Sequence, residues 1–132
     1  AHGRASVDPG LATGSNHFSV ALGRLDDECA FVPDLVKIDV EGLEADVLKG
    51  GERVLRDHMP DLYLEMHGDG RADKIRRATH VLNLLLDFGY QHIVHVESGL
   101  LAGIHGAEVS YEGHLFATGR VQRGASLGDA NT

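Results

Sequence analysis

The sequence predicts an α/β fold with a mostly parallel sheet that ends in an antiparallel hairpin. An apolar, β-branched run at residues 35–40 changes at Gly42 to an apolar pattern with helical spacing, which is typical of a strand, a turn and a helix. A second unit of the same kind follows it along the chain. The last two strand-like segments, residues 90–96 and 111–118, have no helix between them, so we expect them to pair as antiparallel neighbours.

Size, charge and cysteine content limit the classes of protein that fit the sequence. The chain has 132 residues, which is enough for one small domain with its own core. Its 20 Asp and Glu residues outnumber its 12 Lys and Arg residues, and no basic patch of the kind that binds nucleic acid is visible. It has neither a secretory signal pattern nor a run approaching the roughly 18 to 20 apolar residues of a membrane span. With its single cysteine, Cys29, it favours a cytoplasmic protein that binds neither nucleic acid nor membranes.

The amino-terminal part of the chain contains only short predicted elements. Residues 1–17 carry Gly, Ser, Asp, Pro and Asn without periodicity, which indicates a loop or disordered lead-in. Residues 18–22 alternate apolar and small side chains, so we expect a short strand there. Asp26 is a candidate N-cap for a short helix over residues 27–31, because its carboxylate can accept hydrogen bonds from the first N–H groups. Pro33 ends this helix.

Residues 35–40 predict the first central strand, which we expect to be buried on both faces as in a helix-covered parallel sheet. Lys37, Asp39 and Glu41 share one side of this strand. Charges on that side need partners or a water-filled cleft, because an unpaired buried charge is costly. Open parallel sheets bind ligands beyond the carboxyl ends of their strands, so Asp39 and Glu41 are the first candidates for chemistry.

Apolar residues recur at helical spacing between Leu43 and Leu55 and predict a helix that covers the sheet. The charged residues of this segment, Glu44 among them, are expected on the opposite face. Gly50 and Gly51 interrupt the pattern at a cost of about 1 kcal/mol each, which indicates a weak joint or a close backbone contact.

Residues 62–67 predict the second central strand, with Glu65 and His67 on the same side. A strand, a crossover helix and a further strand form a right-handed unit with parallel strands in nearly all cases. If the two strands are neighbours, their acidic ends lie roughly 5 to 10 Å apart at the same edge of the sheet.

The remainder of the chain predicts one long helix and the closing hairpin. A turn at residues 68–70 precedes an amphipathic helix that ends at Gly89. The glycine-rich residues 98–106 predict a loop between the last two strands. Residues 119–132 are polar and are expected to fray.

Three segments together resemble the FkbM family of S-adenosylmethionine-dependent methyltransferases. Residues 34–50 resemble the family signature (D)LVKIDVEGxExxVLKG without a gap. Upstream, Leu25-Asp26-Asp27 resembles an LDD motif of the family, and residues 60–67 resemble its next strand, which ends in Glu and His. The resemblance covers residues 20–90, with a weaker echo at residues 114–116.

The resemblance implies a partial Rossmann-like methyltransferase sheet over residues 18–118. It also implies transfer of a methyl group from S-adenosylmethionine to a hydroxyl oxygen of a small molecule or sugar. The glycine-rich turn for the methionine part of the cofactor and the acidic residue for its ribose are missing from this sequence. We therefore expect a carboxyl-terminal fragment that is inactive alone, with the cofactor motif upstream.

The candidate site residues follow from the chemistry that this reaction needs. Methyl transfer to oxygen requires alignment of donor and acceptor and removal of the acceptor proton. Asp39, Glu65 and His67 are the candidate catalytic residues, because carboxylates and imidazoles act as general bases. Glu41 and Lys37 are the candidate substrate-binding residues. Structural roles are the alternative. Of Asp39 and Glu41, one could cap the following helix and the other could pair with Lys37. Glu65 and His67 could instead bond to loop backbone.

Two other functions remain open at this point. The acidic residues and the imidazole could gather a divalent cation, as in a metal-dependent hydrolase, although we assign none of them to a metal. The chain could also be a non-catalytic α/β module whose acidic cleft binds a partner or is held together by salt bridges. The sequence identifies neither the acceptor nor the oligomeric state.

Overall fold

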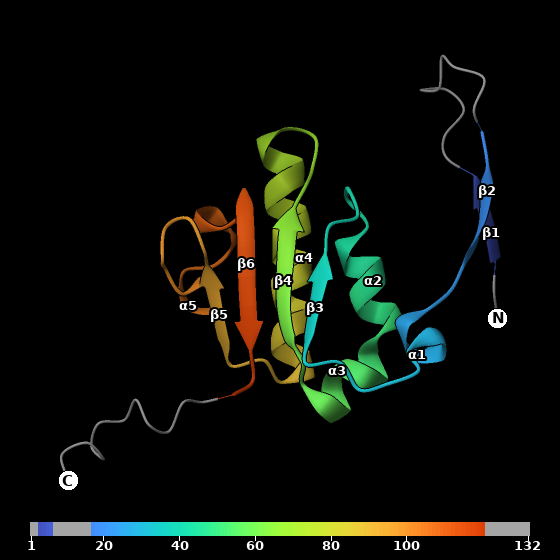
Figure 1. The fold of residues 1–132 in the computed structure, drawn as a ribbon. Helices are drawn as coiled ribbons and strands as arrows, with labels where there is room; N and C mark the ends of the chain where they lie inside the picture. The colour runs from blue at the N-terminus through green and yellow to red at the C-terminus, as the bar shows by residue number, and fades with distance from the viewer. Residues whose placement is uncertain (1–2, 7–16, 121–132) are drawn as a thin grey trace, which may run out of the picture.

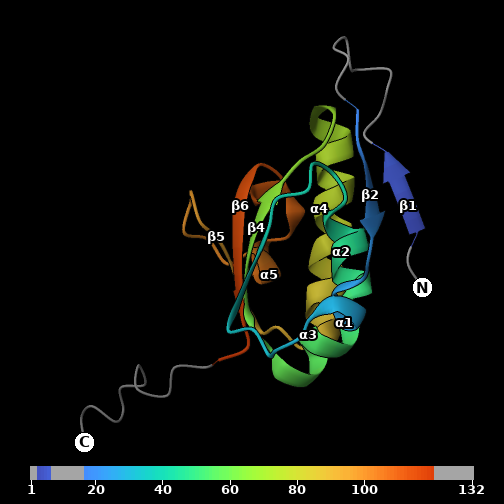
Figure 2. The ribbon, with the colours of Figure 1, turned by 45° about the vertical axis from the view of Figure 1, so that its right-hand side comes forward.

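The computed structural model describes residues 3–6 and 17–120, in which one sheet carries helices on one of its faces (Figures 1 and 2). The elements in chain order are β1 (Gly3–Ser6), β2 (Ser19–Leu22), α1 (Leu25–Glu28), β3 (Leu35–Ile38), α2 (Glu44–Gly50), α3 (Glu52–His58), β4 (Asp61–Met66), α4 (Gly70–Phe88), β5 (His92–His95), α5 (Ala102–His105), the 3₁₀ helix η1 (Ala107–Val109) and β6 (Gly113–Thr118). None of the helices in these residues is long and apolar enough to cross a membrane.

The main sheet has the strand order β3-β4-β6-β5 (Figure 1). Strands β3 and β4 pair in parallel, whereas β6 pairs antiparallel with both β4 and β5. The antiparallel pairing of the last two strands is confirmed. The mostly parallel sheet is not, because β6 inserts between β4 and β5 and makes the described sheet mixed.

Alternation along the strands separates a buried face from an open one. On β4, Leu62 and Leu64 are fully buried under the helices, whereas Tyr63 and Glu65 on the other face are only partly buried. Helix α4 contributes Val81, Leu82 and Leu85 to the same core, and these residues recur at helical spacing. Among residues 3–6 and 17–120, the helices that pack on this sheet all lie on one of its faces (Figure 2).

Strand β3 corrects one prediction. It was expected to be buried on both faces, but Leu35 is 58% exposed and Lys37 is exposed, while Ile38 alone of its residues is buried. The reason is its position, because β3 is the edge strand of the described sheet and its second face carries no helix.

The amino-terminal elements differ from the predicted ones in two respects. Gly3–Ser6, within the predicted lead-in, forms β1 and pairs antiparallel with β2, while residues 7–16 lie outside the described part. Helix α1 begins at Leu25, and Asp26 does not cap it. Its carboxylate instead accepts the backbone N–H groups of Arg53 and Val54 at 3.0 and 2.9 Å, so Asp26 caps α3 from another element.

Gly51 explains why the predicted single helix is divided into α2 and α3. A Cβ atom at this position would lie 2.8 Å from Cδ2 of Leu25, so helix α1 packs against the bare backbone of the joint. The close backbone contact expected at this pair of glycines is confirmed.

The second half of the chain follows the predictions more closely. Helix α4 ends at Gly89, which adopts the left-handed conformation at a φ of 107°. The segment predicted as a loop is partly helical, because α5 and η1 fold over the sheet and bury Ala102 and Ala107. Of the predicted polar tail, residues 121–132 lie outside the described residues.

Candidate active site

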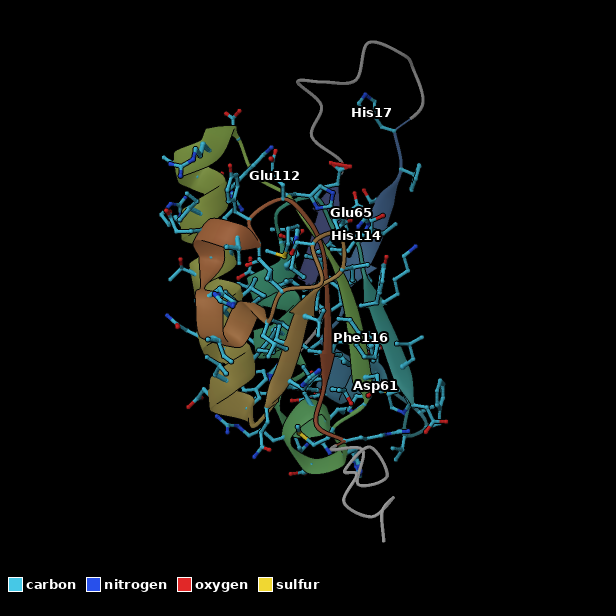
Figure 3. The ribbon with its side chains drawn as sticks, turned by 90° about the vertical axis from the view of Figure 1, so that its left-hand side faces the viewer. His17, Asp61, Glu65, Glu112, His114 and Phe116 are labelled. Carbon is cyan, nitrogen blue, oxygen red and sulfur yellow. The ribbon has the colours of Figure 1, made fainter. Side chains whose placement is uncertain are left out.

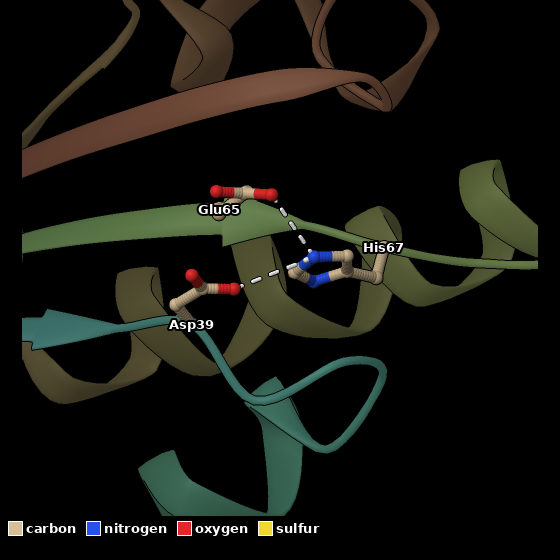
Figure 4. A group of neighbouring side chains, drawn as sticks. All are labelled: Asp39, Glu65 and His67. Carbon is tan, nitrogen blue, oxygen red and sulfur yellow. Dashed lines mark hydrogen bonds and ion pairs between the residues drawn. The ribbon is translucent and has the colours of Figure 1, made fainter.

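The carboxyl ends of β3 and β4 meet at one edge of the sheet and bring the three candidate catalytic residues together (Figure 4). Asp39 follows β3 directly, Glu65 lies near the end of β4, and His67 follows that strand. One ligand-type atom from each of the three lies within 4.8 Å of the others. The sequence-based expectation that these side chains share an edge is confirmed by this geometry.

The imidazole of His67 is the centre of this cluster. Its Nε2 atom lies 3.1 Å from Glu65 Oε2 and 3.5 Å from Asp39 Oδ1. On the other side of the ring, Nδ1 lies 3.0 Å from Glu44 Oε2. An ionised carboxylate accepts hydrogen bonds and donates none, so a ring with a proton on each nitrogen satisfies this arrangement.

The surroundings of His67 favour its protonated form. Burial is the largest single influence and lowers the pKa of His67. The hydrogen bond to Glu44 and the negative charges of Glu44, Glu65 and Glu41 together outweigh it. The pKa is therefore raised above the ordinary value of 6.5. The cluster is therefore an imidazole between carboxylates that favour its protonated form.

Glu44 is the residue of this site that the sequence analysis misplaced. It was expected on the exposed face of its helix, but it is 1% exposed. It is the first residue of α2, and its carboxylate turns back to accept the N–H of Gly42 at 2.8 Å as well as bonding His67. Helical periodicity fails to predict this because first-turn side chains can point past the helix end rather than along its face. The signal that could have found it is the second Glu of the signature motif.

A tight turn between β3 and α2 makes the contact of Glu44 possible. Glu41 and Gly42 both have positive φ angles, 51° and 98°, and Gly42 fits a region that favours glycine. Arg77 on α4 donates a hydrogen bond from Nη1 to the carbonyl oxygen of Gly42 at 2.5 Å. A Cβ atom on Gly42 would lie 3.0 Å from that same nitrogen, so another residue would crowd the arginine as well as strain the turn.

The two candidate substrate-binding residues lie at the margin of the cluster. Glu41 is exposed, and its charge contributes to the raised pKa of His67. Lys37 is exposed on the open face of β3 and forms no ion pair with either neighbouring acid within the described residues. The N-cap position of α2 is Leu43 and has no side-chain cap, so neither of the structural roles considered for Asp39 and Glu41 is observed.

The cluster also has the composition of a metal site, since two carboxylates and one imidazole suit several divalent cations. A cation there would need the Nε2 lone pair of His67 and would have to displace its proton. A cavity of about 280 Å³ lies beside the site, between α2 and α4, and shares Gly42 and Glu44 with it. Its other walls include Asp46, Arg77 and His80.

Comparison with known proteins gives one match. A family model described as the methyltransferase FkbM domain matches residues 6–92, which include Asp39, Glu44, Glu65 and His67. The searches of curated proteins and of solved structures gave no significant match. The match begins upstream of the resemblance noted in the sequence and covers more than half of the chain. This chain therefore belongs to the FkbM methyltransferase domain family.

Proposed function

We propose that the protein transfers a methyl group from S-adenosylmethionine to a hydroxyl oxygen of a small molecule or sugar. Family membership points to a methyltransferase. The observation that carries the rest of the proposal is the imidazole of His67 between Asp39 and Glu65, at the sheet edge where ligands of α/β folds bind. The side chains of Asp39 and Glu65 are 45% and 38% exposed, so an acceptor can reach both carboxylates.

In the proposed mechanism, Asp39 receives the proton of the acceptor hydroxyl. Bound S-adenosylmethionine would supply the methyl group, which would exchange its bond to sulfur for a bond to the acceptor oxygen and leave a neutral thioether. The proton of the hydroxyl passes to the Asp39 carboxylate. His67 holds Asp39 and Glu65 in place, and Glu44 fixes the orientation of the His67 ring. The carboxylates at this edge of the sheet would also attract the positive charge of a bound sulfonium.

In this proposal, the cofactor-binding residues and the acceptor site lie in different segments of the polypeptide. The residues that bind the methionine and ribose parts of the cofactor belong to a segment upstream of this chain, and residues 18–118 are the carboxyl-terminal part of the domain. The position of β3 at the edge of the sheet formed by the described residues supports this arrangement, because an edge strand with the 58% exposed side chain of Leu35 can accept a further strand. This chain alone is then inactive.

Calorimetry and a methylation assay test the proposal. Titration of S-adenosylmethionine is expected to release no heat with this chain and to give a clear binding isotherm with the protein expressed from the complete gene. That protein is expected to methylate a hydroxyl acceptor in the presence of a chelator. Absence of cofactor binding in both forms would favour a non-catalytic module, and hydrolysis that a chelator abolishes without any methyl donor would favour a metal-dependent hydrolase.

A further inference from the structure

A second imidazole, that of His114, lies beside Glu65 of the candidate site (Figure 3). His114 on β6 is the register partner of Glu65 on β4. Its Nε2 atom lies 3.4 Å from Glu65 Oε1, while the other oxygen of that carboxylate, Oε2, lies 3.1 Å from His67 Nε2. Each oxygen of the Glu65 carboxylate therefore lies close to the imidazole of a different histidine.

His114 is itself fixed by Glu97, which follows β5. One oxygen of Glu97 accepts the backbone N–H of His114 at 2.8 Å, and the other oxygen bonds Nδ1 of the ring. The ring of Tyr63 stacks on His114 with 5.2 Å between the centroids. A side chain at Gly113 would collide with the Glu97 carboxylate, so the glycine leaves the space that this carboxylate fills.

The surroundings of His114 and Glu97 favour the charged form of each side chain. The hydrogen bond from His114 lowers the pKa of Glu97 to about 2, and the hydrogen bond to Glu97 raises the pKa of His114. His95, from β5, is a further titratable group that faces Glu97, and its Nε2 atom lies 3.4 Å from Glu97 Oε1. Glu65 faces His114 from β4.

We propose that His114 and Glu97 are positioning residues of the candidate site, which hold the Glu65 carboxylate against His67. Glu97 fixes the His114 ring, and the ring holds Glu65 Oε1 so that Oε2 is directed at His67. The site thus extends over β4 and β6 to the segment after β5. The catalytic consequence of this hold depends on the proposed methyl transfer, whereas the hold itself does not.

The sign of one titration shift distinguishes positioning from simple charge. His114→Asn removes a cation near the cluster, and a through-space effect alone would raise the titration midpoint of His67. Loss of the hold on Glu65 lowers it instead, because His67 loses a carboxylate partner. We expect a decrease of about half a pH unit, followed through the ring ¹⁵N resonances of His67 in this chain.

Glu97→Gln is the second variant, because it preserves the size of the side chain and its amide oxygen can still accept the backbone N–H. It is expected to lower the midpoints of both His114 and His67. The matched control is Glu112→Gln, which removes an equal charge two residues before His114, where the carboxylate is 62% exposed and pairs with Lys74. The control should move neither midpoint. An unchanged or raised midpoint of His67 in both site variants would overturn the proposal.

Activity supplies an independent reading in the protein expressed from the complete gene. Glu97→Gln is expected to lower kcat about 10-fold without changing the KM for S-adenosylmethionine, because a misplaced Glu65 weakens alignment but not cofactor binding. Glu97→Asp should restore part of the loss. If the wild-type protein transfers no methyl group, the proposed function fails while the titrations still decide whether His114 and Glu97 hold Glu65.

Discussion

Carboxylates are paired by different cations on the two sides of this molecule. On the helical side, Arg56 bonds Glu52 at 2.7 Å and Asp87 at 2.6 Å. At the carboxyl edge of the sheet, His67 takes the equivalent place between Glu44 and Glu65. Arginine stays charged at every physiological pH, whereas histidine changes its charge near neutrality. The helical pairs therefore keep their charges across the physiological pH range, whereas the His67 cluster can gain or lose a proton.

The largest expected effect comes from removing the bridging cation on each side. His67→Gln in the protein expressed from the complete gene is expected to lower turnover about 100-fold, because Asp39 and Glu65 lose the group that holds them. Arg56→Gln removes the equivalent cation from the helical side. It should leave turnover unchanged and lower only the melting temperature, measured by circular dichroism. Equal losses of turnover in the two variants would contradict the distinction.

The next effect is on the free energy of unfolding, and it compares a buried carboxylate, Glu44, with an exposed one, Glu52. Glu44→Gln is expected to destabilise the chain by about 1 to 3 kcal/mol, since a buried charge-assisted pair loses one partner. Glu52→Gln breaks an exposed helical pair whose carboxylate is 50% exposed, and should cost less than about 1 kcal/mol. Urea unfolding of both variants measures the difference. A cost for Glu44→Gln no larger than that for Glu52→Gln would show that Glu44 is not bonded as described.

The pH dependence of stability gives a smaller effect with a defined sign. The pKa of His67 is raised above 6.5 in the folded chain, so its contribution to stability is fully present below that value. The contribution is lost as the pH rises through the folded pKa. Melting temperatures should therefore fall between about pH 6 and pH 8 more steeply in the wild-type chain than in His67→Gln. Parallel curves for the two proteins would contradict the raised pKa.

The smallest effect is expected on the helical side in acid. The backbone N–H of Asp69 and the side chain of Arg77 lower the pKa of Asp73 to about 2, from an ordinary value of 3.8. Its contribution is present above the ordinary value and is lost as the pH falls through the folded pKa. Asp73→Asn should flatten the acid end of the stability curve and leave the curve near neutrality parallel to that of the wild type. A change confined to neutral pH would contradict this assignment.

The position of the candidate site could be predicted from the sequence, because strand alternation and the geometry of parallel neighbours place Asp39, Glu65 and His67 at one edge. These are local rules that need only the chain order. The end of α4 at Gly89 follows from the same kind of rule, since the left-handed conformation there favours glycine.

Contacts between distant segments could not be predicted in the same way. Asp26 caps α3 across 27 residues, and Glu44 is buried by a turn that reverses the chain. The insertion of β6 between β4 and β5 depends on which strands β6 pairs with, and hydrophobic alternation contains no information about that choice. His114 lies beside Glu65 only because of this insertion.

Asp39→Asn, in the protein expressed from the complete gene, tests most directly whether the rim is the place where the acceptor loses its proton. Turnover and the Kd for S-adenosylmethionine are measured on the same preparation. We expect kcat to fall by about 100-fold or more while the Kd stays within about twofold, because the substitution removes a base and leaves the cofactor contacts intact. Unchanged values of both quantities would contradict the assignment of the acceptor site to this edge of the sheet.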